Sequence, residues 1–413
     1  MRTLLADLGD PHLHLRAIHI AGSKGKGSTA LYVERLLEHL GYSSFTFTSP
    51  HLERWTERLR LNGAEADAER AREAIDAVRA ASARTGVRPG FFEALTVAAF
   101  WLAHHAGVDW CVIECGVGGR ADATNVLRPA VTAITSIELE HTDRLGPTRA
   151  AIAREKAGIV NPGAPLIAPE LPAELDAVLA NAARAADVPF VRVRPDPGDK
   201  GRTPAAGDVH WRYAGGLLTL TGADFALTTP MASPGPHMAV NAAIAATLVA
   251  QLGLVSGPAL ERAFRAIAET ALPGRLEILS SSPWLMVDGA HTPASAEALA
   301  TAVRVIAPPR VHLLLSCSTS KSLAPTLTPL LALADAVTTT CADPEYSFPA
   351  ETLAQRVHQL APHLPVSPQP TPARALARVR ATMDDQTLIL ATGSVYLAGA
   401  VRHAFYTPGA TAV

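Results

Sequence analysis

Charged residues and long apolar runs are both scarce in this chain. Asp, Glu, Lys and Arg make up only 18% of the 413 residues, and the formal net charge is −2. This balance gives no field of one sign that would attract nucleic acid or an anionic membrane surface. The longest apolar stretch, residues 240–254, is too short and too interrupted to span a bilayer, and the N-terminus has no signal-peptide core. We therefore expect a cytoplasmic protein with neither a nucleic-acid nor a membrane partner.

Cysteine is also rare, and the positions of the cysteines indicate neither a disulfide framework nor a metal site. The four cysteines are Cys111, Cys115, Cys317 and Cys341. The first two lie four residues apart in a predicted strand and its exit loop, a spacing that matches neither a disulfide scaffold nor a metal-ligand pattern. Buried free thiols are the expectation, because cysteine is among the residues most often found in protein cores.

Apolar residues are abundant, at 48% of the chain, and they form alternating strand and helix patterns. A chain of this length exceeds what one core usually holds, so at least two domains are expected. Short apolar runs such as 109–114 and 131–137 predict buried parallel strands. The alternation predicts an α/β fold, with a doubly wound, mostly parallel sheet domain and a smaller C-terminal α/β domain. Residues 208–229 instead predict an antiparallel hairpin at the sheet edge.

A change in composition marks the expected border between the two domains. Proline, glycine and serine gather at 272–275 and again at 280–283. We expect a first domain over residues 1–272, a linker over 273–283 and a second domain over 284–413.

A glycine-rich turn near the N-terminus has the composition of a phosphate-binding loop. Three glycines lie within residues 22–27, between an apolar strand pattern and a helical pattern over 28–40. In such a turn, backbone N–H groups attract an anion, a lysine adds positive charge and a hydroxyl can bind Mg²⁺. Lys26 and Ser28 are the candidates. Gly27 separates them, which breaks the usual order, so an ordinary tight strand-to-helix connection remains the alternative.

Polar side chains near the ends of other predicted strands could complete such a site. They are Ser49, Glu114, His141 and Lys156. Ligands bind at the carboxyl edge of open parallel sheets, and hydroxyl and carboxylate oxygens suit Mg²⁺. Taken singly, each also fits a solvated loop or helix face. The same holds in the later part of the chain, where 288–293 follows a strand and opens a helix with Thr292 as a simple cap.

The ordered motifs together resemble the folylpolyglutamate synthase/dihydrofolate synthase family of the Mur ligase superfamily. The resemblance runs from about residue 17 to residue 402. Gly27 supports this branch, since the muramyl-peptide ligases of the superfamily tend to have Gly-Lys followed directly by Ser or Thr. The motifs are HIAGSKGKGSTA (19–30), TSPHLERWTERLRLNG (48–63), FFEALTVAAF (91–100), ECGVGGRADATNV (114–126), ITSIELEHTDRLG (134–146), AREKAGIV (153–160), HMAVNAA (237–243), LPGRLEIL (272–279), VDGAHTPAS (287–295) and ATGSVYLAGAVR (391–402).

The resemblance implies a P-loop-type first domain, a Rossmann-like second domain and a set of nucleotide contacts. Lys26 would cradle the ATP phosphates between two glycines, and Ser28 would lie beside the Mg²⁺-linked phosphate. Taken alone, Asn241 and Arg275 would be ordinary helix and linker residues. The implied ATP-binding residues are Gly25, Lys26, Gly27, Ser28, Asn241, Arg275 and Asp288.

The resemblance also implies a metal site and catalytic residues. Ser49, Glu114 and His141 match the metal-site positions, together with Ser28. Lys156 matches a lysine that is carbamylated in this family, and His291 lies where the second domain faces the glutamate and acyl-phosphate region. Lys26, Lys156 and His291 are thus the expected catalytic residues. Departures from the family pattern are Lys24 in place of Asn, Glu138 in place of Gly, Glu140 in place of Asp and Thr292 in place of Asn.

The implied function is an ATP-dependent ligase of folate biosynthesis that serves one-carbon metabolism. It would add L-glutamate to a folate, with or without action on dihydropteroate, through an acyl phosphate. ATP and Mg²⁺ are the implied cofactors, and a monomer is expected by analogy with relatives. The alternatives are an amide ligase for another carboxylate acceptor and a nucleotide-binding homologue that has lost ligation.

Overall fold

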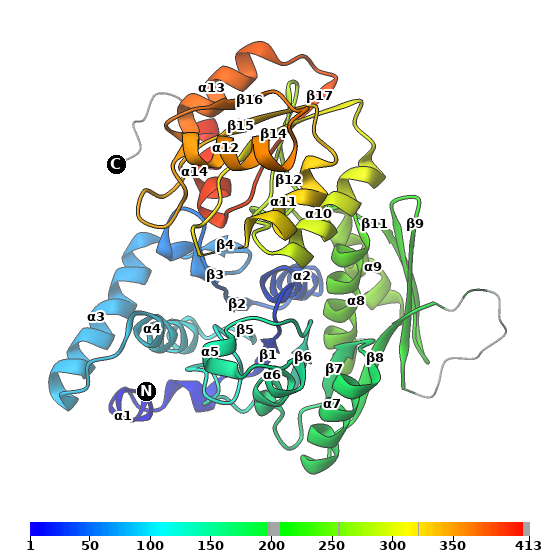
Figure 1. Ribbon diagram of the computed structural model, residues 1–413. Helices are drawn as coiled ribbons and strands as arrows, with labels where there is room; N and C mark the ends of the chain where they lie inside the picture. Colours follow the sequence, from blue (N-terminus) through cyan, green and yellow to red (C-terminus); the bar gives the residue numbers. More distant parts are fainter. Residues whose placement is uncertain (197, 199–206, 255–256, 321, 408–413) are drawn as a thin grey trace. The chain divides into compact units, whose positions relative to one another are not determined.

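The computed structural model describes residues 1–407 apart from 197, 199–206, 255–256 and 321. The chain forms two compact units. Unit 1 comprises residues 1–51, 55–232 and 237–270, and unit 2 comprises residues 52–54, 233–236 and the chain from 271 onward. Figure 1 follows both units by colour along the sequence. The short segment 52–54 belongs to unit 2, although the chain on either side of it belongs to unit 1.

Unit 1 is built on an 11-stranded sheet with the order β11-β10-β9-β8-β7-β6-β1-β5-β2-β3-β4. The strands from β9 to β2 in this order pair in parallel, and both edges are antiparallel. The strands are β1 (Ala17–Ala21), β2 (Ser44–Phe47), β3 (Leu59–Leu61), β4 (Ala64–Glu65), β5 (Trp110–Glu114), β6 (Val131–Ile134), β7 (Leu166–Pro169), β8 (Phe190–Pro195), β9 (Val209–Ala214), β10 (Leu217–Thr221) and β11 (Ala226–Pro230).

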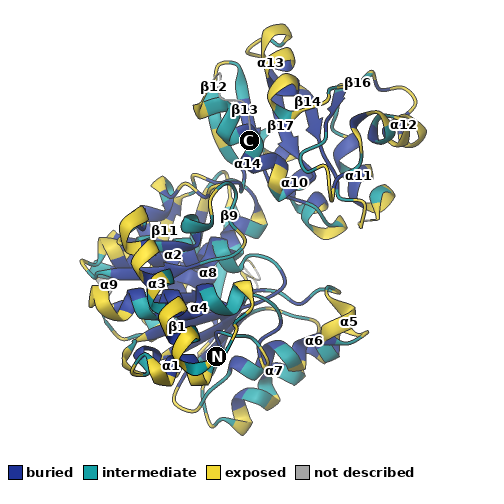
Figure 2. Cartoon of the chain, turned by 90° about the vertical axis from the view of Figure 1, so that its left-hand side faces the viewer, coloured by how far each residue is buried: buried dark blue, intermediate teal, exposed yellow. Residues whose placement is uncertain are grey.

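The central strands of this sheet are buried throughout. Every residue of β1, β2, β5 and β6 is buried. A parallel strand that is covered on both faces has a continuous apolar sequence, and the run that leads to Glu114 has this character. Figure 2 shows the strands in the dark blue of buried residues, with exposed positions on the outer helices.

Helices supply the cover of the sheet. α3 and α4 share one hydrophobic cluster with β2 and β5, whereas α6 and α7 share another with β6 and β7. The helices of unit 1 are α1 (Arg2–Asp7), α2 (Lys26–His39), α3 (Ala68–Thr85), α4 (Phe91–Ala106), α5 (Thr142–Leu145), α6 (Arg149–Lys156), α7 (Ala173–Ala185), α8 (Pro236–Gln251) and α9 (Gly257–Phe264), with the 3₁₀ turns η1 (Pro11–His14), η2 (Trp55–Arg58), η3 (Ala157–Ile159) and η4 (Arg265–Glu269).

Unit 2 contains a six-stranded sheet with the order β12-β13-β17-β14-β15-β16. Among the described strand pairs of this sheet, only β12–β13 is antiparallel. The elements are β12 (Glu277–Ser281), β13 (Trp284–Val287), α10 (Pro293–Ile306), β14 (Arg310–Leu315), α11 (Leu323–Leu331), β15 (Ala336–Thr339), α12 (Ala350–Leu360), β16 (Val366–Pro368), α13 (Pro372–Thr382), β17 (Thr387–Thr392) and α14 (Val395–Tyr406). Within the described part of the chain, no helix has the length and apolar character to cross a membrane.

The predicted fold class is confirmed, since a mostly parallel α/β sheet unit is accompanied by a smaller α/β unit. The hairpin expected over 208–229 is formed by β9 and β10, and β11 extends it at the sheet edge. Within the stretch expected to be a linker, residues 277–281 form β12 and pair with β13. The Ser-Pro signal at 282–283 is the turn of that hairpin, which explains why the composition changes there.

Candidate active site

The glycine-rich turn connects β1 directly to α2. Gly25 occupies the N-cap position of α2 in a left-handed conformation, with φ of 85°. A Cβ atom at this position would collide with Oδ1 of Asn241, so the turn requires glycine there on two grounds. Gly25 has no side chain with which to cap α2, and a helix start without a side-chain cap is the kind that binds anionic ligands.

Hydrogen bonds to the loop after β6 fix the shape of this turn. The backbone N–H of Ser23 donates to the carbonyl oxygen of Ser136 over 2.9 Å, and the N–H of Lys24 donates to the Ser136 hydroxyl over 2.7 Å. The hydroxyl of Thr135 donates in turn to the carbonyl oxygen of Lys24. The N–H of Glu138 donates to the Ser23 hydroxyl over 2.9 Å. The turn is therefore held in place before any ligand arrives.

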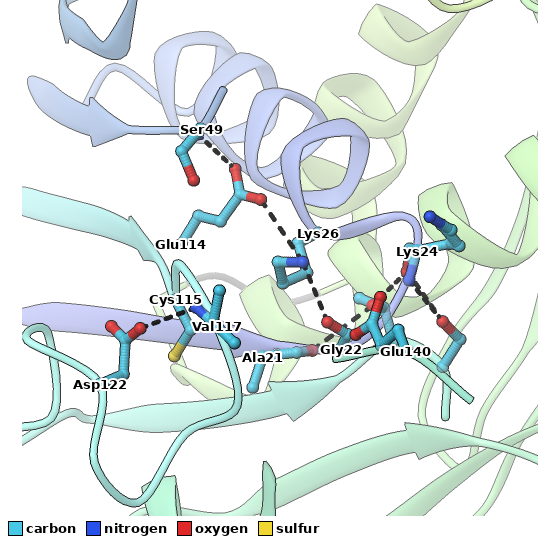
Figure 3. Close-up of polar contacts among 12 residues, drawn as sticks. Ala21, Gly22, Lys24, Lys26, Ser49, Glu114, Cys115, Val117, Asp122 and Glu140 are labelled. Carbon is cyan, nitrogen blue, oxygen red and sulfur yellow. Dashed lines mark hydrogen bonds and ion pairs between the residues drawn. The ribbon is translucent and has the colours of Figure 1, made fainter. Parts of the chain in front are cut away.

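Lys26, Glu114 and Ser49 meet at the carboxyl edge of the sheet, as Figure 3 shows. The ammonium of Lys26 donates to the carbonyl oxygen of Gly22 over 2.9 Å and lies 3.8 Å from Oε1 of Glu114. The other carboxylate oxygen of Glu114 accepts from the backbone N–H of Ser49 over 2.9 Å. Glu114 is only 3% exposed. The sheet order brings these groups together, because β5 lies between β1 and β2.

Lys156 lies at the end of α6 and is 1% exposed. Its ammonium donates to Oε1 of Glu140 over 2.8 Å. Burial lowers the pKa of Lys156, although the neighbouring Glu140 carboxylate acts in the opposite direction. Burial also acts to raise the pKa of Glu140, but the charge and hydrogen bond of Lys156, together with the charge of Lys26 and the Ser23 hydroxyl, lower it overall. His141 follows Glu140 in a left-handed conformation, with φ of 46°, and is the N-cap residue of α5.

A buried hydrogen-bond network beneath the turn was not predicted from the sequence. His19 lies on β1 at 0% exposure, and its Nε2 atom is 2.8 Å from the hydroxyl of Thr124 and 3.1 Å from Sγ of Cys115. The Thr124 hydroxyl donates to Asp122, and Asp122 also accepts from the backbone N–H of Val117. Burial lowers the pKa of His19 to about 4. The only sequence signal was a histidine within an otherwise apolar strand.

The remaining candidates divide between the two units. Asn241 lies on α8 in unit 1 and closes over Gly25. In unit 2, the carboxylate of Asp288 accepts from the N–H groups of Leu276 and Ala290 over 2.9 and 2.8 Å, and Arg275 donates to the carbonyl oxygen of Gly274.

Two further residues of unit 2 follow Asp288. Nδ1 of His291 lies 2.8 Å from the carbonyl oxygen of Gly289. Thr292 caps α10 by accepting from the N–H of Ser295, which is the structural role that the sequence allowed for it.

The donor set around Glu114 fits a magnesium ion. Mg²⁺ prefers oxygen ligands, keeps several waters and needs only one or two carboxylates from the protein. Ser28 is buried in the first turn of α2, and Gly27 leaves the carboxylate of Glu114 only 3.3 Å from where a Cβ would stand. Across the described residues, no group of three or more His, Cys, Asp or Glu side chains could hold a metal by itself. A metal here would thus need hydroxyl, water or ligand oxygens besides Glu114.

The fold and this site define an α/β protein with a glycine-rich turn at the carboxyl edge of its sheet, and its second unit matches a known ligase domain. Residues 274–395 match the Mur ligase, glutamate ligase domain. The chain is 37% identical over 305 residues to a probable bifunctional folylpolyglutamate synthase/dihydropteroate synthase of Halobacterium salinarum, a match that covers 73% of this chain and 36% of that relative. The chain therefore spans only about a third of this larger relative.

Two further comparisons cover most of the protein compared. The folylpolyglutamate synthase of Lacticaseibacillus casei is 31% identical over 310 residues, which cover 73% of this chain and 71% of that protein. The crystal structure of a bifunctional folylpolyglutamate synthase/dihydrofolate synthase from Yersinia pestis, complexed with AMPPNP and a Mn ion, superposes with a TM-score of 0.83 at 26% identity and covers 98% of this chain and 92% of that chain. The chain belongs to the folylpolyglutamate synthase/dihydrofolate synthase family.

Proposed function

We propose that this protein is an ATP-dependent ligase that adds L-glutamate to a folate, and also to dihydropteroate if it is bifunctional. The observation that carries the proposal is the preformed turn at the start of α2, with Lys26 facing the buried carboxylate of Glu114. The match of unit 2 to a glutamate ligase domain supports the second substrate. An ATP-dependent route is required because a carboxylate is a poor acylating agent until it is converted to an acyl phosphate.

The residues of the turn have separate proposed tasks. The N–H groups at the start of α2 and the ammonium of Lys26 bind the phosphates and offset the charge of the transferring phosphoryl group. Asn241 packs so closely against Gly25 that this position has no room for a side chain. We assign nucleotide contacts to Arg275 and Asp288, and we place His291 beside the glutamate and acyl-phosphate region.

A magnesium ion would be held by Ser28, Ser49, Glu114 and His141. When bound, Mg²⁺ supplies Lewis-acid stabilisation of negative charge on phosphoryl oxygens. The Mn ion in the Yersinia pestis relative supports a divalent metal in this family. Glu114 is suited to the role, because its buried carboxylate is an oxygen donor that the N–H of Ser49 holds in place.

We further propose that Lys156 is carbamylated, as the family resemblance implies. Burial lowers the pKa of its amine, and the neutral amine is the form that combines with CO₂. A carbamate would place a second anion against Glu140, so the carbamylated state requires Glu140 to leave its 2.8 Å contact. Activity lost in Lys156→Ala should return in part with short carboxylic acids, and a complete lack of rescue would count against the carbamate.

The finer organisation of the protein is also part of the proposal. We assign ATP binding to residues 1–272, a connecting role to 273–283 and glutamate ligation to 284–413. We also propose that the protein is a cytoplasmic monomer with no nucleic-acid or membrane partner. Sedimentation of the purified chain at micromolar concentration tests the monomer directly.

One assay separates this function from its alternatives. ADP release is measured with glutamate and one of three acceptors, namely tetrahydrofolate, dihydropteroate or a muramyl nucleotide. Release that depends on a folate or pteroate supports the proposal. Release only with the muramyl nucleotide supports a Mur-type amide ligase, and ATP binding without release for any acceptor supports a nucleotide-binding homologue.

Lys26→Ala tests the phosphate role of the turn. We expect kcat to fall by about 100-fold or more, because a preorganised charge at the reacting phosphoryl group is lost. Arg35→Ala is the matched control, since Arg35 lies on the surface of the same helix and pairs with Glu38. Turnover by Lys26→Ala at the level of the control would remove Lys26 from the mechanism.

A further inference from the structure

The segment Leu52-Glu53-Arg54 leaves unit 1 for three residues and is built into unit 2. It interrupts the connection between β2 and η2, both of which belong to unit 1. The surroundings of Leu52 and Glu53 within unit 2 show what holds the segment there.

Two glycines of unit 2 make room for Leu52. A Cβ atom at Gly399 would collide with the carbonyl oxygen of Leu52, and a Cβ at Gly274 would stand 2.8 Å from its side chain. Gly399 lies in the interior of α14, where glycine is less favourable than alanine by about 1 kcal/mol. The close approach of the Leu52 backbone explains why a glycine stands at this position of the helix.

A half-buried ionic cluster holds the neighbouring Glu53. Nη1 of Arg402 donates to Glu53 over 2.9 Å, and Nε of the same guanidinium donates to Glu277 over 2.8 Å. Nδ1 of His403 lies 3.3 Å from the second oxygen of Glu53. Arg402 and Glu53 are 19% and 13% exposed. At this burial, removing one partner leaves a charge with little water to replace it.

The anchored segment lies near two candidate site residues. Along the chain it is close to Ser49, a candidate metal residue, and its Leu52 side chain contacts the turn that contains Arg275, a candidate nucleotide-binding residue. Ser49 precedes Leu52 by three residues, which span about 10 Å at most. Gly274, which receives the Leu52 side chain, precedes Arg275, and its N–H donates to Glu277 over 2.7 Å. Glu277 therefore braces both the Arg275 turn and the guanidinium that holds Glu53.

We propose that Glu53 and Arg402 are positioning residues for the metal site, acting through the Leu52 anchor on Ser49. The N–H of Ser49 donates to Glu114, so a shift of the anchored segment alters the support of that carboxylate. We assign neither residue a direct contact with the metal or a substrate. The inference rests on the proposed metal role of Ser49 and Glu114, and it adds the residues that keep them in place.

The test measures Mn²⁺ binding rather than turnover. Free Mn²⁺ is counted by electron paramagnetic resonance in titrations of the full chain with a saturating non-hydrolysable ATP analogue. We expect Glu53→Gln and Gly399→Ala each to weaken Mn²⁺ binding by about 10-fold, the scale of other residues that orient metal ligands. Arg304→Met is the control, because Arg304 forms an exposed ion pair with Glu297 in the same unit.

The double variant Glu114→Ala/Glu53→Gln decides whether Glu53 acts through the carboxylate that the N–H of Ser49 supports. Binding no weaker than in Glu114→Ala alone supports the proposal, and additive losses overturn it. Unchanged Mn²⁺ affinity in Glu53→Gln, when Ser49→Ala binds weakly, also overturns it and leaves the proposed function intact. Unchanged affinity in Ser49→Ala defeats the metal role of Ser49 itself. If Gly399→Ala fails to fold, the isosteric Glu53→Gln still carries the test.

Discussion

His19 makes the stability of unit 1 depend on pH in a calculable way. The imidazole is 0% exposed, and burial lowers its pKa from 6.5 to about 4. Asp122 faces the ring and acts to raise the pKa, but burial dominates. Above pH 6.5 the ring is neutral in both the folded and the unfolded chain. Between pH 6.5 and 4 only the unfolded chain binds the proton, so the free energy of unfolding falls as the pH falls.

The size of the effect follows from the two pKa values. They differ by about 2.5, and each pH step of one is worth about 1.4 kcal/mol, so His19 removes roughly 3 kcal/mol of stability between pH 6.5 and pH 4. Other histidines with lowered pKa values contribute as well, and the difference between wild type and His19→Gln isolates this one. Glutamine keeps a hydrogen-bonding amide for Thr124 but cannot take up the proton.

Urea unfolding at several pH values between 4.5 and 7.5 measures this difference. The protein carries Trp284→Phe in all samples, so that the remaining tryptophans, at 55, 101, 110 and 211, report only on unit 1. We expect the two stability curves to be parallel above pH 6.5 and to converge or cross below it, because wild type loses stability faster. Curves that remain parallel down to pH 4.5 would refute the assignment of a neutral buried His19.

Two further predictions concern local geometry. Gly25→Ala should abolish nucleotide binding in calorimetry, because the new Cβ meets Asn241. The control is Gly41→Ala, at φ of 83° with open space around it. It should bind nucleotide like wild type and lose about 1 kcal/mol of stability. Asp67→Ala should cost about 1 kcal/mol in urea unfolding, because Asp67 caps α3 by accepting from the N–H of Arg70, and an unchanged midpoint would contradict that role.

Much of the fold could be predicted because the buried strands have recognisable apolar sequences. The run before Glu114 and the β-branched run at Val131–Ile134 are buried at every position, as a central parallel strand requires. The β12 strand could not be separated from the linker, because its residues Glu277–Ser281 alternate too weakly and are only partly buried. Local signals there reflected the hairpin turn more than the strand.

The sequence predicted that the site residues lie near the ends of strands, but it did not predict which of them contact one another. That Ser49 and Glu114 face each other depends on β2 and β5 being neighbours, and strand order is a long-range property. The ion pair between Lys156 and Glu140 joins residues 16 positions apart, and each of them had a separate explanation in the sequence. The Leu52 anchor depends on Gly399, about 350 residues later in the chain, which no local pattern connects with it.

The uncapped start of α2 has a consequence for the lifetime of the protein. Gly25 supplies no side-chain acceptor for the first N–H groups of this 14-residue helix, and glycine at an N-cap is less stabilising than Ser or Asp by roughly a few tenths of a kcal/mol. A bound anion supplies the missing acceptor, and any ligand that binds only the folded state raises its population by mass action. The melting temperature should therefore follow nucleotide concentration, so that protease susceptibility reports the supply of the nucleotide that occupies the turn.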